Sequence, residues 1–584
     1  MTQEELAPKR SWEEIARKKR AAIAASLPSQ WQVQSVPSAD SVPSAFGLVR
    51  EGLSPKEIEI TEIESASKLL SRIASGDLSA VEVTEAFSHR ATIAHQLTNC
   101  LSEVLFADAK QRALELDEHY AKTGKTVGPL HGLPISLKDQ FRIEGVDTSL
   151  GYVSWLGKPE TQETESQLVS DLRKLGAVFY CKTNVPTSLM AIETNNNIVG
   201  YTKNAHNRLL SSGGSSGGEA ALLALRGSIL GIGSDVGKLS WMLSLLHSLI
   251  TDPQRFTGAS IRLPCAFNGI VGLKPSHNRT SCLRVANSME GQSVVRSAIG
   301  GMGHSIQDLR LLTRTMLDVQ PWILDPNVVP LPWRQGLEDE TRKKIASKKL
   351  RFGVIRSDGM VRPHPPVARA VDEAVKALVA KGHEVIEWEP PAHAEAFVSL
   401  WDTFAADGGK DIHSQLEVSG EPPVPELAIS YGEKVGHLPV SSLNDAWTIE
   451  TRKYDYGVRY ASYWQSTGVD AVIAPAAPTT SHKPTKGRYF GYTGVWNVLD
   501  YSAVAVRSGT TVDKAVDVAV ASATPLNPLD EEVAKQYDPE LFHGMPIGLQ
   551  VVGQRLEEEQ VLAIAEEVDL ILGHGSTGLD TNAI

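Results

Sequence analysis

The chain has 584 residues, of which 42% are hydrophobic and 22% are charged, and its formal net charge is -12. This length is sufficient for a large buried core, and the composition is that of an ordinary soluble globular protein. A nucleic-acid-binding protein would normally carry a basic face, so the acidic balance argues against that class. The balance favours a protein that acts on small molecules.

The cysteines and the apolar segments indicate where the protein works. Cys100, Cys181, Cys265 and Cys282 are scattered without close pairs, which fits neither a zinc site nor a disulfide scaffold. We therefore expect a reducing, cytoplasmic environment. The N-terminus is too charged for a signal peptide, and no run reaches the roughly 18 apolar residues that a membrane span needs. We expect no membrane span.

Residues 1–59 are predicted to form an N-terminal extension made of a helix and an extended arm. A polar, amphipathic helix is expected from about Trp12 to Ala25. Residues 27–60 are rich in Pro and Ser and predict an extended arm over the surface. Helical periodicity then begins in residues 65–97, where apolar residues recur at spacings of three and four.

The rest of the chain alternates short apolar runs with helical patterns. The apolar runs suit buried strands, and they occupy residues 133–139, 177–183, 351–355, 470–478 and 545–553. A helical pattern over residues 367–382 separates two of them. This alternation predicts an α/β layered fold, and the absence of a clear linker predicts one large domain over residues 60–575 with a tail at 576–584.

The segment GPLHGLPISLKDQF contains the first candidate for chemistry, Lys138. This lysine ends a short apolar run, and a solvated lysine at a strand end is the simplest interpretation. A catalytic role would require burial. A free lysine titrates near pH 10.4, so its pKa must fall by several units before the neutral amine can accept a proton.

A glycine and serine run, Gly213–Gly217, satisfies the G-x-S-x-G pattern of a nucleophile elbow centred on Ser215. An elbow needs a preceding strand, but polar residues precede this run. The run passes directly into an apolar helical segment, which indicates function rather than a flexible linker. A Ser-His-Asp esterase would need a histidine near Ser215, and His131, His206 and His247 are available without a motif that places them.

Residues 231–249 resemble a phosphate-binding loop only superficially. The motif G-x-x-x-x-G-K-[ST] fails twice, because Ile232 stands at the first glycine position and Leu239 follows Lys238. No H-E-x-x-H motif is present either. We therefore expect neither a nucleotide cofactor nor a metal.

A third segment, GASIRLPCAFNGIVGLKPS around Ser260, completes a recognisable set. Together the three segments closely resemble the amidase-signature family, in which a Gly-Ser-rich run is followed by D-x-G-[GA]-S-[IV]-R-x-P. The resemblance extends from about Ile60 to Gly573, and its flanks are similar to the fungal acetamidase or general amidase branch. It implies a single large domain with a mixed β-sheet core covered by helices on both sides.

The resemblance implies hydrolysis of small carboxylic amides, such as acetamide, to a carboxylic acid and ammonia. It implies that Ser260 is the nucleophile that forms an acyl-enzyme, that Ser215 is the bridging serine after a cis peptide bond, and that Lys138 is the neutral base. This agrees with the chemistry of serine, which is a poor nucleophile without an oriented base.

The resemblance further implies an oxyanion and substrate-binding set made of Val236, Gly237, Ala259 and Leu189. It implies no cofactor, a small-molecule amide as substrate, and an assembly that could be a homodimer. A related member of the family, an amidotransferase subunit acting on charged tRNA, would need a glutaminase partner surface, and the acetamidase-like flanks argue against it.

The signature is interrupted between Gly237 and Ala259. The intervening stretch, Lys238–Gly258, has 21 residues, and its removal restores the family spacing of 24 positions between Ser215 and Ser260. Either the insert is genuine, giving an impaired amidase or a non-catalytic binding protein, or it is a translated intron. We prefer the intron, because 21 codons keep the frame and Gly237-Lys238 could be encoded across a splice donor.

The insert falls on the backbone N–H groups expected to form the oxyanion hole. We expect that Gly237 and Ala259 must be covalent neighbours for their N–H groups to converge with that of Ser260. Closing a longer loop costs only about 0.6 kcal/mol per doubling of its length, so the fold should tolerate the insert. The apolar segment Trp241–Ile250 within it is expected to lie on the surface or over the site.

Overall fold

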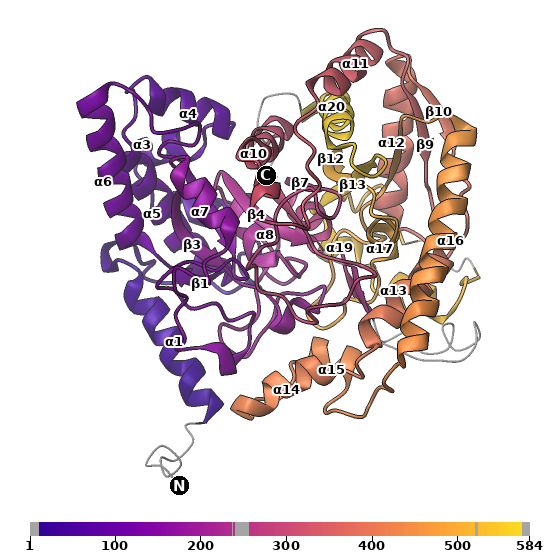
Figure 1. Cartoon of the computed structure of the whole chain (residues 1–584), viewed down its shortest axis with the longest axis horizontal. Coiled ribbons are helices and arrows are strands. Elements are labelled where there is room, and N and C mark those ends of the chain that lie inside the picture. Colours follow the sequence, from indigo (N-terminus) through magenta and orange to yellow (C-terminus); the bar gives the residue numbers. More distant parts are fainter. Residues whose placement is uncertain (1–10, 236, 240–255, 520–523, 575–584) are drawn as a thin grey trace.

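A computed structural model describes residues 11–235, 237–239, 256–519 and 524–574 of the chain (Figure 1). Across these residues eleven strands form one sheet, and two short strands form a second. The strands are β1 (Leu101–Val104), β2 (Pro134–Lys138), β3 (Val178–Thr183), β4 (Leu230–Asp235), β5 (Gly237–Leu239), β6 (Phe256–Gly258), β7 (Val271–Lys274), β8 (Ala298–Gly303), β9 (Arg351–Val354), β10 (Glu384–Glu387), β11 (Ala471–Pro475), β12 (Ala503–Thr511) and β13 (Pro546–Val552).

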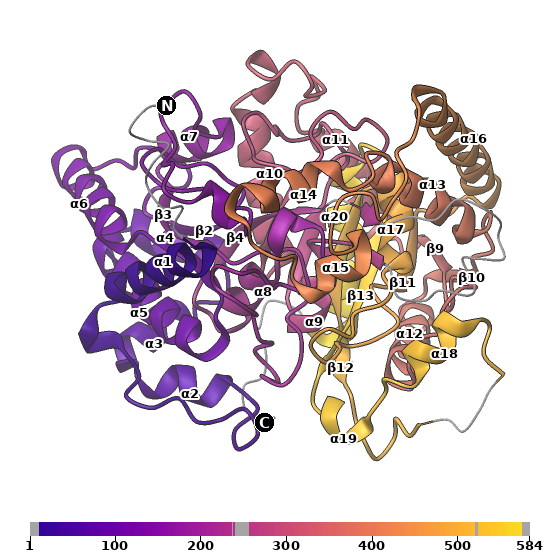
Figure 2. The ribbon, with the colours of Figure 1, turned by 90° about the horizontal axis from the view of Figure 1, so that it is seen from below.

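The α-helices of the same residues lie around the sheet on either side (Figures 1 and 2). They are α1 (Trp12–Ser26), α2 (Phe46–Glu51), α3 (Pro55–Thr61), α4 (Ala66–Ala74), α5 (Ala80–Thr98), α6 (Phe106–Thr123), α7 (Gln167–Lys174), α8 (Gly217–Ala224), α9 (Arg262–Asn268), α10 (Ile306–Asp318), α11 (Gln335–Ala346), α12 (Pro365–Ala380), α13 (His393–Ala405), α14 (Lys410–Ser419), α15 (Pro425–Tyr431), α16 (Leu443–Thr467), α17 (Gly491–Val498), α18 (Pro528–Ala534), α19 (Pro539–Phe542) and α20 (Glu558–Asp569).

The large sheet has the strand order β1-β3-β2-β4-β8-β7-β12-β13-β11-β9-β10. The pairs β2–β3, β2–β4, β9–β10 and β9–β11 are parallel, and the other pairs are antiparallel. The predicted α/β fold with a mixed sheet is therefore confirmed. Because β2 and β4 are parallel neighbours, their carboxyl ends lie at the same edge of the sheet.

Alternate residues of β11 belong to different apolar clusters, which shows that both faces of the sheet are covered. Ala471 and Ile473 pack in a cluster that contains residues of α12 and α20. Val472 and Ala474 pack in a cluster that contains residues of α13 and α17. A strand buried on both faces has few polar residues, which explains the continuous apolar run of this segment.

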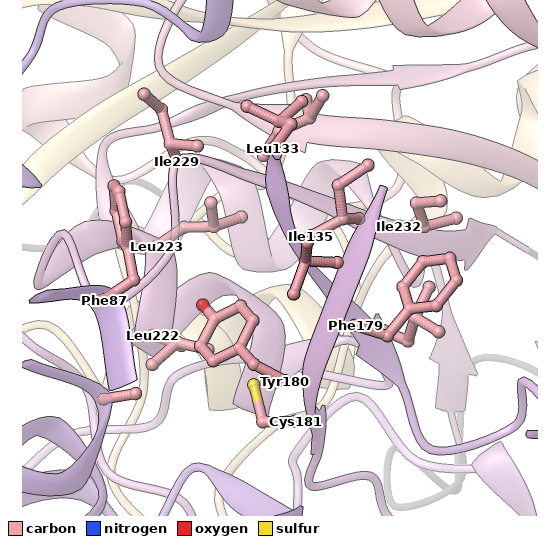
Figure 3. Close-up of a cluster of buried hydrophobic side chains, with 14 of the residues drawn as sticks. Phe87, Leu133, Ile135, Phe179, Tyr180, Cys181, Leu222, Leu223, Ile229 and Ile232 are labelled. Carbon is pink, nitrogen blue, oxygen red and sulfur yellow. The ribbon is translucent and has the colours of Figure 1, made fainter. Parts of the chain in front are cut away.

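The apolar core beside the candidate site joins α5 and α8 to strands β2, β3 and β4 (Figure 3). Phe87 of α5 and Leu222 of α8 lie in this core with Ile135 of β2, Tyr180 of β3 and Ile232 of β4. All five side chains are buried. This packing fixes α8, and with it the glycine and serine run that opens the helix, against the edge where β2 and β4 end.

Glycines allow α8 to approach the sheet and the loop that follows β3 closely. A Cβ atom on Gly231 of β4 would lie 1.9 Å from Glu219 Oε1, and one on Gly233 would lie 3.0 Å from Ser216 Oγ. A Cβ atom on Gly218 would lie 2.4 Å from the backbone N of Asn184. The glycines of this region therefore serve close packing.

The N-terminal extension differs in part from its prediction. Helix α1 covers the predicted residues, and the Ser11 hydroxyl accepts a hydrogen bond from the N–H of Glu14. Helices α2 and α3, however, occupy part of the stretch expected to be an extended arm. In α3, Ser54 and Glu57 form a capping box and Pro55 is the first helical residue, so residues 54–57 carry a helix-start signal that the Pro and Ser content obscures.

We expect Gly218→Ala to lower the free energy of unfolding by about 1–3 kcal/mol, because the added methyl group would overlap backbone atoms that cannot move aside. Gly336→Ala is the matched control. Gly336 is also the second residue of its helix, and nothing lies within 4 Å of its Cβ position. Urea denaturation of both variants would measure the difference, and equal stabilities would contradict the packing argument.

Candidate active site

Lys138, the last residue of β2, is fully buried. Its Nζ lies 2.7 Å from Ser215 Oγ and 2.9 Å from Ser234 Oγ, and Ser234 belongs to the neighbouring strand β4. The Ser234 hydroxyl donates a hydrogen bond to the side-chain carbonyl of Gln140. The interpretation of Lys138 as a solvated lysine is therefore wrong, because the parallel pairing of β2 and β4 encloses its side chain.

Ser215 lies two residues before α8, and the peptide bond between Gly214 and Ser215 is cis, as the resemblance implies. Its side chain is buried. The next residue connects this run to the third candidate, because the N–H of Ser216 donates to the carbonyl oxygen of Ser260 at 3.1 Å. The three segments that carry the resemblance therefore converge at one edge of the sheet.

Among the described residues, the surroundings of Ser215 do not match a nucleophile elbow of a Ser-His-Asp hydrolase. In the described part of the chain, no strand runs into the glycine and serine run. The ring nitrogen Nδ1 of His131 accepts from the N–H of Val127, and His206 Nε2 lies 3.1 Å from the carbonyl of Asn268. His247 lies outside the described residues.

Ser260 lies two residues before α9 and is 5% exposed, so it is the least enclosed of the three candidate residues. The preceding residue, Ala259, is buried and has a φ of 81°. This left-handed conformation is uncommon for a residue with a Cβ atom and is found mainly where surrounding structure enforces it. The backbone around Ser260 is thus held in a specific, sparsely populated conformation.

The buried ion pair of Asp235 and Arg262 holds the Ser260 segment in place. Asp235, at the end of β4, accepts hydrogen bonds from the N–H of Ile261 at 3.2 Å and from Arg262 Nε at 3.0 Å. Arg262 also donates to Asn497 Oδ1 at 2.6 Å and to Gln550 Oε1 at 3.0 Å. Burial alone would raise the pKa of Asp235, but the Arg262 guanidinium and the Asn497 amide hold it down at about 2.

The two ends of the insert pair with each other as the short antiparallel strands β5 and β6. Gly237 of β5 is the register partner of Gly258 of β6, and Lys238 is the partner of Thr257. Opposed residues of an antiparallel pair have Cα atoms about 4.5–5.5 Å apart, compared with about 3.8 Å for covalent neighbours. The expectation that the insert separates its two flanks is therefore corrected, because the strand pair keeps them close. Val236 and residues 240–255 lie outside the described residues.

Leu189 lies in the same apolar cluster as Ala259, the residue before Ser260. It ends a short 3-10 helix, and both Ser188 and Leu189 have positive φ values, of 68° and 65°. The loop that follows contacts the glycine and serine run closely, since a Cβ atom on Gly214 would lie 2.7 Å from the carbonyl oxygen of Ala191. The structure therefore brings Leu189 to the same region as the three candidate residues.

Several supporting residues were not predicted from the sequence. Asn497 and Gln550 are far from the signature in the chain, and nothing in their local sequence marks them. Ser234 and Glu219 could have been predicted from the sequence, because Ser234 precedes the aspartate of the signature and Glu219 follows the glycine and serine run. A buried carboxylate at the start of an apolar helix is the signal that could have drawn attention to Glu219.

A model of the family described as Amidase matches residues 82–238 and 256–562 of the chain. The chain belongs to the amidase family. The unmatched residues 239–255 fall inside the stretch identified as an insert. The family assignment and its named relatives show that the protein is an amidase, an enzyme that hydrolyses carbon–nitrogen bonds.

The amidase relatives cover nearly the whole chain. An acetamidase of Aspergillus oryzae is 43% identical over 97% of this chain and 100% of its own length. An acetamidase of Emericella nidulans is 43% identical over 97% of this chain and 99% of its own length. A solved fatty acid amide hydrolase superposes with a TM-score of 0.86 at 32% identity, covering 97% of this chain and 95% of that protein.

Neither a metal-binding cluster nor a membrane-spanning helix is found in the described part of this amidase. It contains no group of three or more His, Cys, Asp or Glu residues placed to hold a metal ion. None of its helices combines the length and the apolar character that crossing a membrane requires.

Proposed function

We propose that this amidase hydrolyses small carboxylic amides, similar to acetamide, through an acyl-enzyme on Ser260 with Ser215 and Lys138 as a proton relay. The observation that carries the proposal is the contact of 2.7 Å between the buried Lys138 Nζ and Ser215 Oγ. The bond from Ser216 N–H to the Ser260 carbonyl supports it, because it holds the nucleophile segment beside the relay. The acetamidase names of two relatives support the substrate class.

In the proposed reaction the Ser260 hydroxyl oxygen attacks the amide carbonyl carbon. The hydroxyl proton of Ser260 passes to Ser215 Oγ while the Ser215 proton passes to the neutral amine of Lys138. When the tetrahedral intermediate collapses, the carbon–nitrogen bond breaks and the relay returns one proton to the leaving nitrogen, which departs as ammonia. Water then repeats the sequence on the acyl-enzyme and releases the carboxylic acid, leaving Ser260 and Lys138 in their starting states.

The oxyanion is proposed to be stabilised by backbone N–H groups of the segment formed by Val236, Gly237, Ala259 and Ser260, with Leu189 at the substrate. The positive φ of Ala259 supports this, because left-handed residues turn successive N–H groups toward one side. The insert interrupts this set. The alternative function is therefore a catalytically impaired amidase-like protein, in which the strand pair of β5 and β6 displaces one donor.

The relay predicts the behaviour of substitutions at two residues, Ser260 and Lys138. Ser260→Ala should abolish labelling by a fluorophosphonate probe, because no acyl-enzyme or its analogue can form. Lys138→Ala should lower amide hydrolysis by several powers of ten, and Lys138→Arg should be no better, because a guanidinium is not deprotonated in a protein. Retained labelling of the Ser260 variant, or near-normal turnover of either Lys138 variant, would contradict the relay.

The insert generates a separate prediction. Deleting Lys238–Gly258 rejoins Gly237 to Ala259, and we expect acetamide hydrolysis to rise by about 10³-fold, because loss of one oxyanion donor costs about 10²–10³ in rate and site groups tolerate shifts of only about 0.5 Å. Thermal denaturation would establish that both forms are folded. Equal rates would show that the β5–β6 pair already presents the donors correctly. Sequencing the transcript across codons 237–258 would identify an intron.

We also propose that the amidase is cytoplasmic, binds no nucleic acid and forms a homodimer. The four cysteines are free, which supports a reducing environment. Helix α16 carries a stripe of apolar side chains with helical spacing, which supports a second copy as partner: Leu443, Trp447, Tyr454 and Val458 are 48–71% exposed. Trp447→Glu should shift the mass measured by light scattering to the monomer without loss of activity, whereas a wild-type monomer would contradict the dimer.

A further inference from the structure

Three fully buried carboxylates lie near the proposed relay, and two of them form ion pairs. Asp139 lies 3.7 Å from Lys182 Nζ, and Asp235 accepts from Arg262 at 3.0 Å. Glu219 is different, because in the described part of the chain no cation lies within ion-pairing distance of it. A buried carboxylate without a paired cation needs another explanation.

The Glu219 carboxylate is held by hydroxyl groups. One oxygen accepts from the Ser136 hydroxyl, and the other accepts from Thr183 Oγ1 at 2.8 Å. The carboxylate fits because residue 231 is a glycine, and a Cβ atom at this position would overlap Glu219 Oε1. Apolar side chains such as Leu222 and Ile232 lie in the core of this region (Figure 3). The site therefore holds a carboxyl group with hydroxyl donors on both oxygens, shielded from solvent.

Glu219 and the Lys138 side chain lie on the same side of the sheet, the side covered by α8. Ser136 and Lys138 are two residues apart on β2, so their side chains project from one face of the sheet with Cα atoms about 7 Å apart. Thr183 of β3, which donates to Glu219, is the register partner of Lys138. Burial raises the pKa of Glu219 to about 7, against the effect of its hydroxyl donors and of the Lys138 charge.

We propose that Glu219 is a positioning residue that sets the proton affinity of the Lys138 amine. An ionised Glu219 stabilises the ammonium form of the lysine, and a protonated Glu219 withdraws that stabilisation and favours the neutral amine that the relay uses. The proposal rests on the proposed role of Lys138 as the base.

The other titratable groups around Glu219 keep their neutral form near neutral pH. Cys100 precedes β1, Tyr180 and Cys181 belong to β3, and Cys265 belongs to α9. Burial raises the pKa of each of these four groups, so none of them carries charge in the range where amide hydrolysis would be assayed. Glu219 is thus the group of this cluster whose charge changes near neutral pH.

The test is the pH dependence of kcat/KM for acetamide in Glu219→Gln. Hydrolysis needs the neutral amine, so activity rises with pH through the pKa of Lys138. Glu219 and Lys138 interact electrostatically, so removing the negative charge of Glu219 should move this acid limb to lower pH. The shift is roughly 1 unit for two charges about 10 Å apart at an effective dielectric constant of about 20. Asp308→Asn is the matched control. Asp308 is a buried acid of α10 with a raised pKa, remote from the relay, and its removal should leave the limb in place.

Two further measurements make the test independent of folding and of hydrolysis. Ser136→Ala and Thr183→Val remove the hydroxyl donors to Glu219, so the carboxyl stays protonated to higher pH and the limb should also move to lower pH. If Glu219→Gln does not fold, these variants decide. The Lys138 amine can also be titrated directly by NMR in protein labelled at the lysine Cε, with its signal assigned by loss in Lys138→Met.

The possible failures are distinguishable. If no form hydrolyses amides but the amine pKa falls in Glu219→Gln, the proposed function fails and the role of Glu219 stands. If hydrolysis is normal and neither the amine pKa nor the acid limb moves in a folded variant, the role of Glu219 is overturned.

Discussion

Burial of the Lys138 amine is the constraint around which the site is arranged. An ammonium group loses its hydration when it is enclosed, and this loss favours the neutral form that can accept a proton. Two hydroxyl groups contact the amine: that of Ser234 accepts from it, because its own proton goes to Gln140, and that of Ser215 can donate or accept and so suits either form of the amine. Two features enclose the amine. The parallel pairing of β2 and β4 places Ser234 against it, and the close approach of α8 places Ser215 against it.

The buried charged residues near the proposed relay have different structural roles. The Asp235–Arg262 pair fixes the backbone before α9, and through Asn497 and Gln550 it connects the Ser260 segment to α17 and β13. Removing one member of such a buried pair commonly costs 3–5 kcal/mol, since the remaining charge is left uncompensated. The second half of the chain therefore supports a proposed relay whose three residues all come from the first half.

The sequence was sufficient for the features that depend on local pattern. The buried strands, the α8 segment and the three candidate residues could be predicted, because apolar runs and the signature lie within short stretches. Burial of Lys138 could not be derived locally, since it depends on Ser234, a residue of another strand. Asn497 and Gln550 were missed for the same reason. The helices α2 and α3 were missed because proline and serine mark both irregular arms and helix starts, and only the Ser54–Glu57 spacing separates the two.

The insert shows how far fold and catalysis can be decoupled at one point of a chain. A strand pair such as Gly237 with Gly258 closes the insert, so β4 and α9 can keep the positions that the sheet and the Asp235–Arg262 pair impose. Stability is therefore little affected, because the cost of loop closure grows slowly with length. An oxyanion donor is more demanding, since a backbone N–H displaced by about 1 Å no longer points at the same atom. The same local change can thus leave the amidase fold intact while it bears directly on the proposed oxyanion hole.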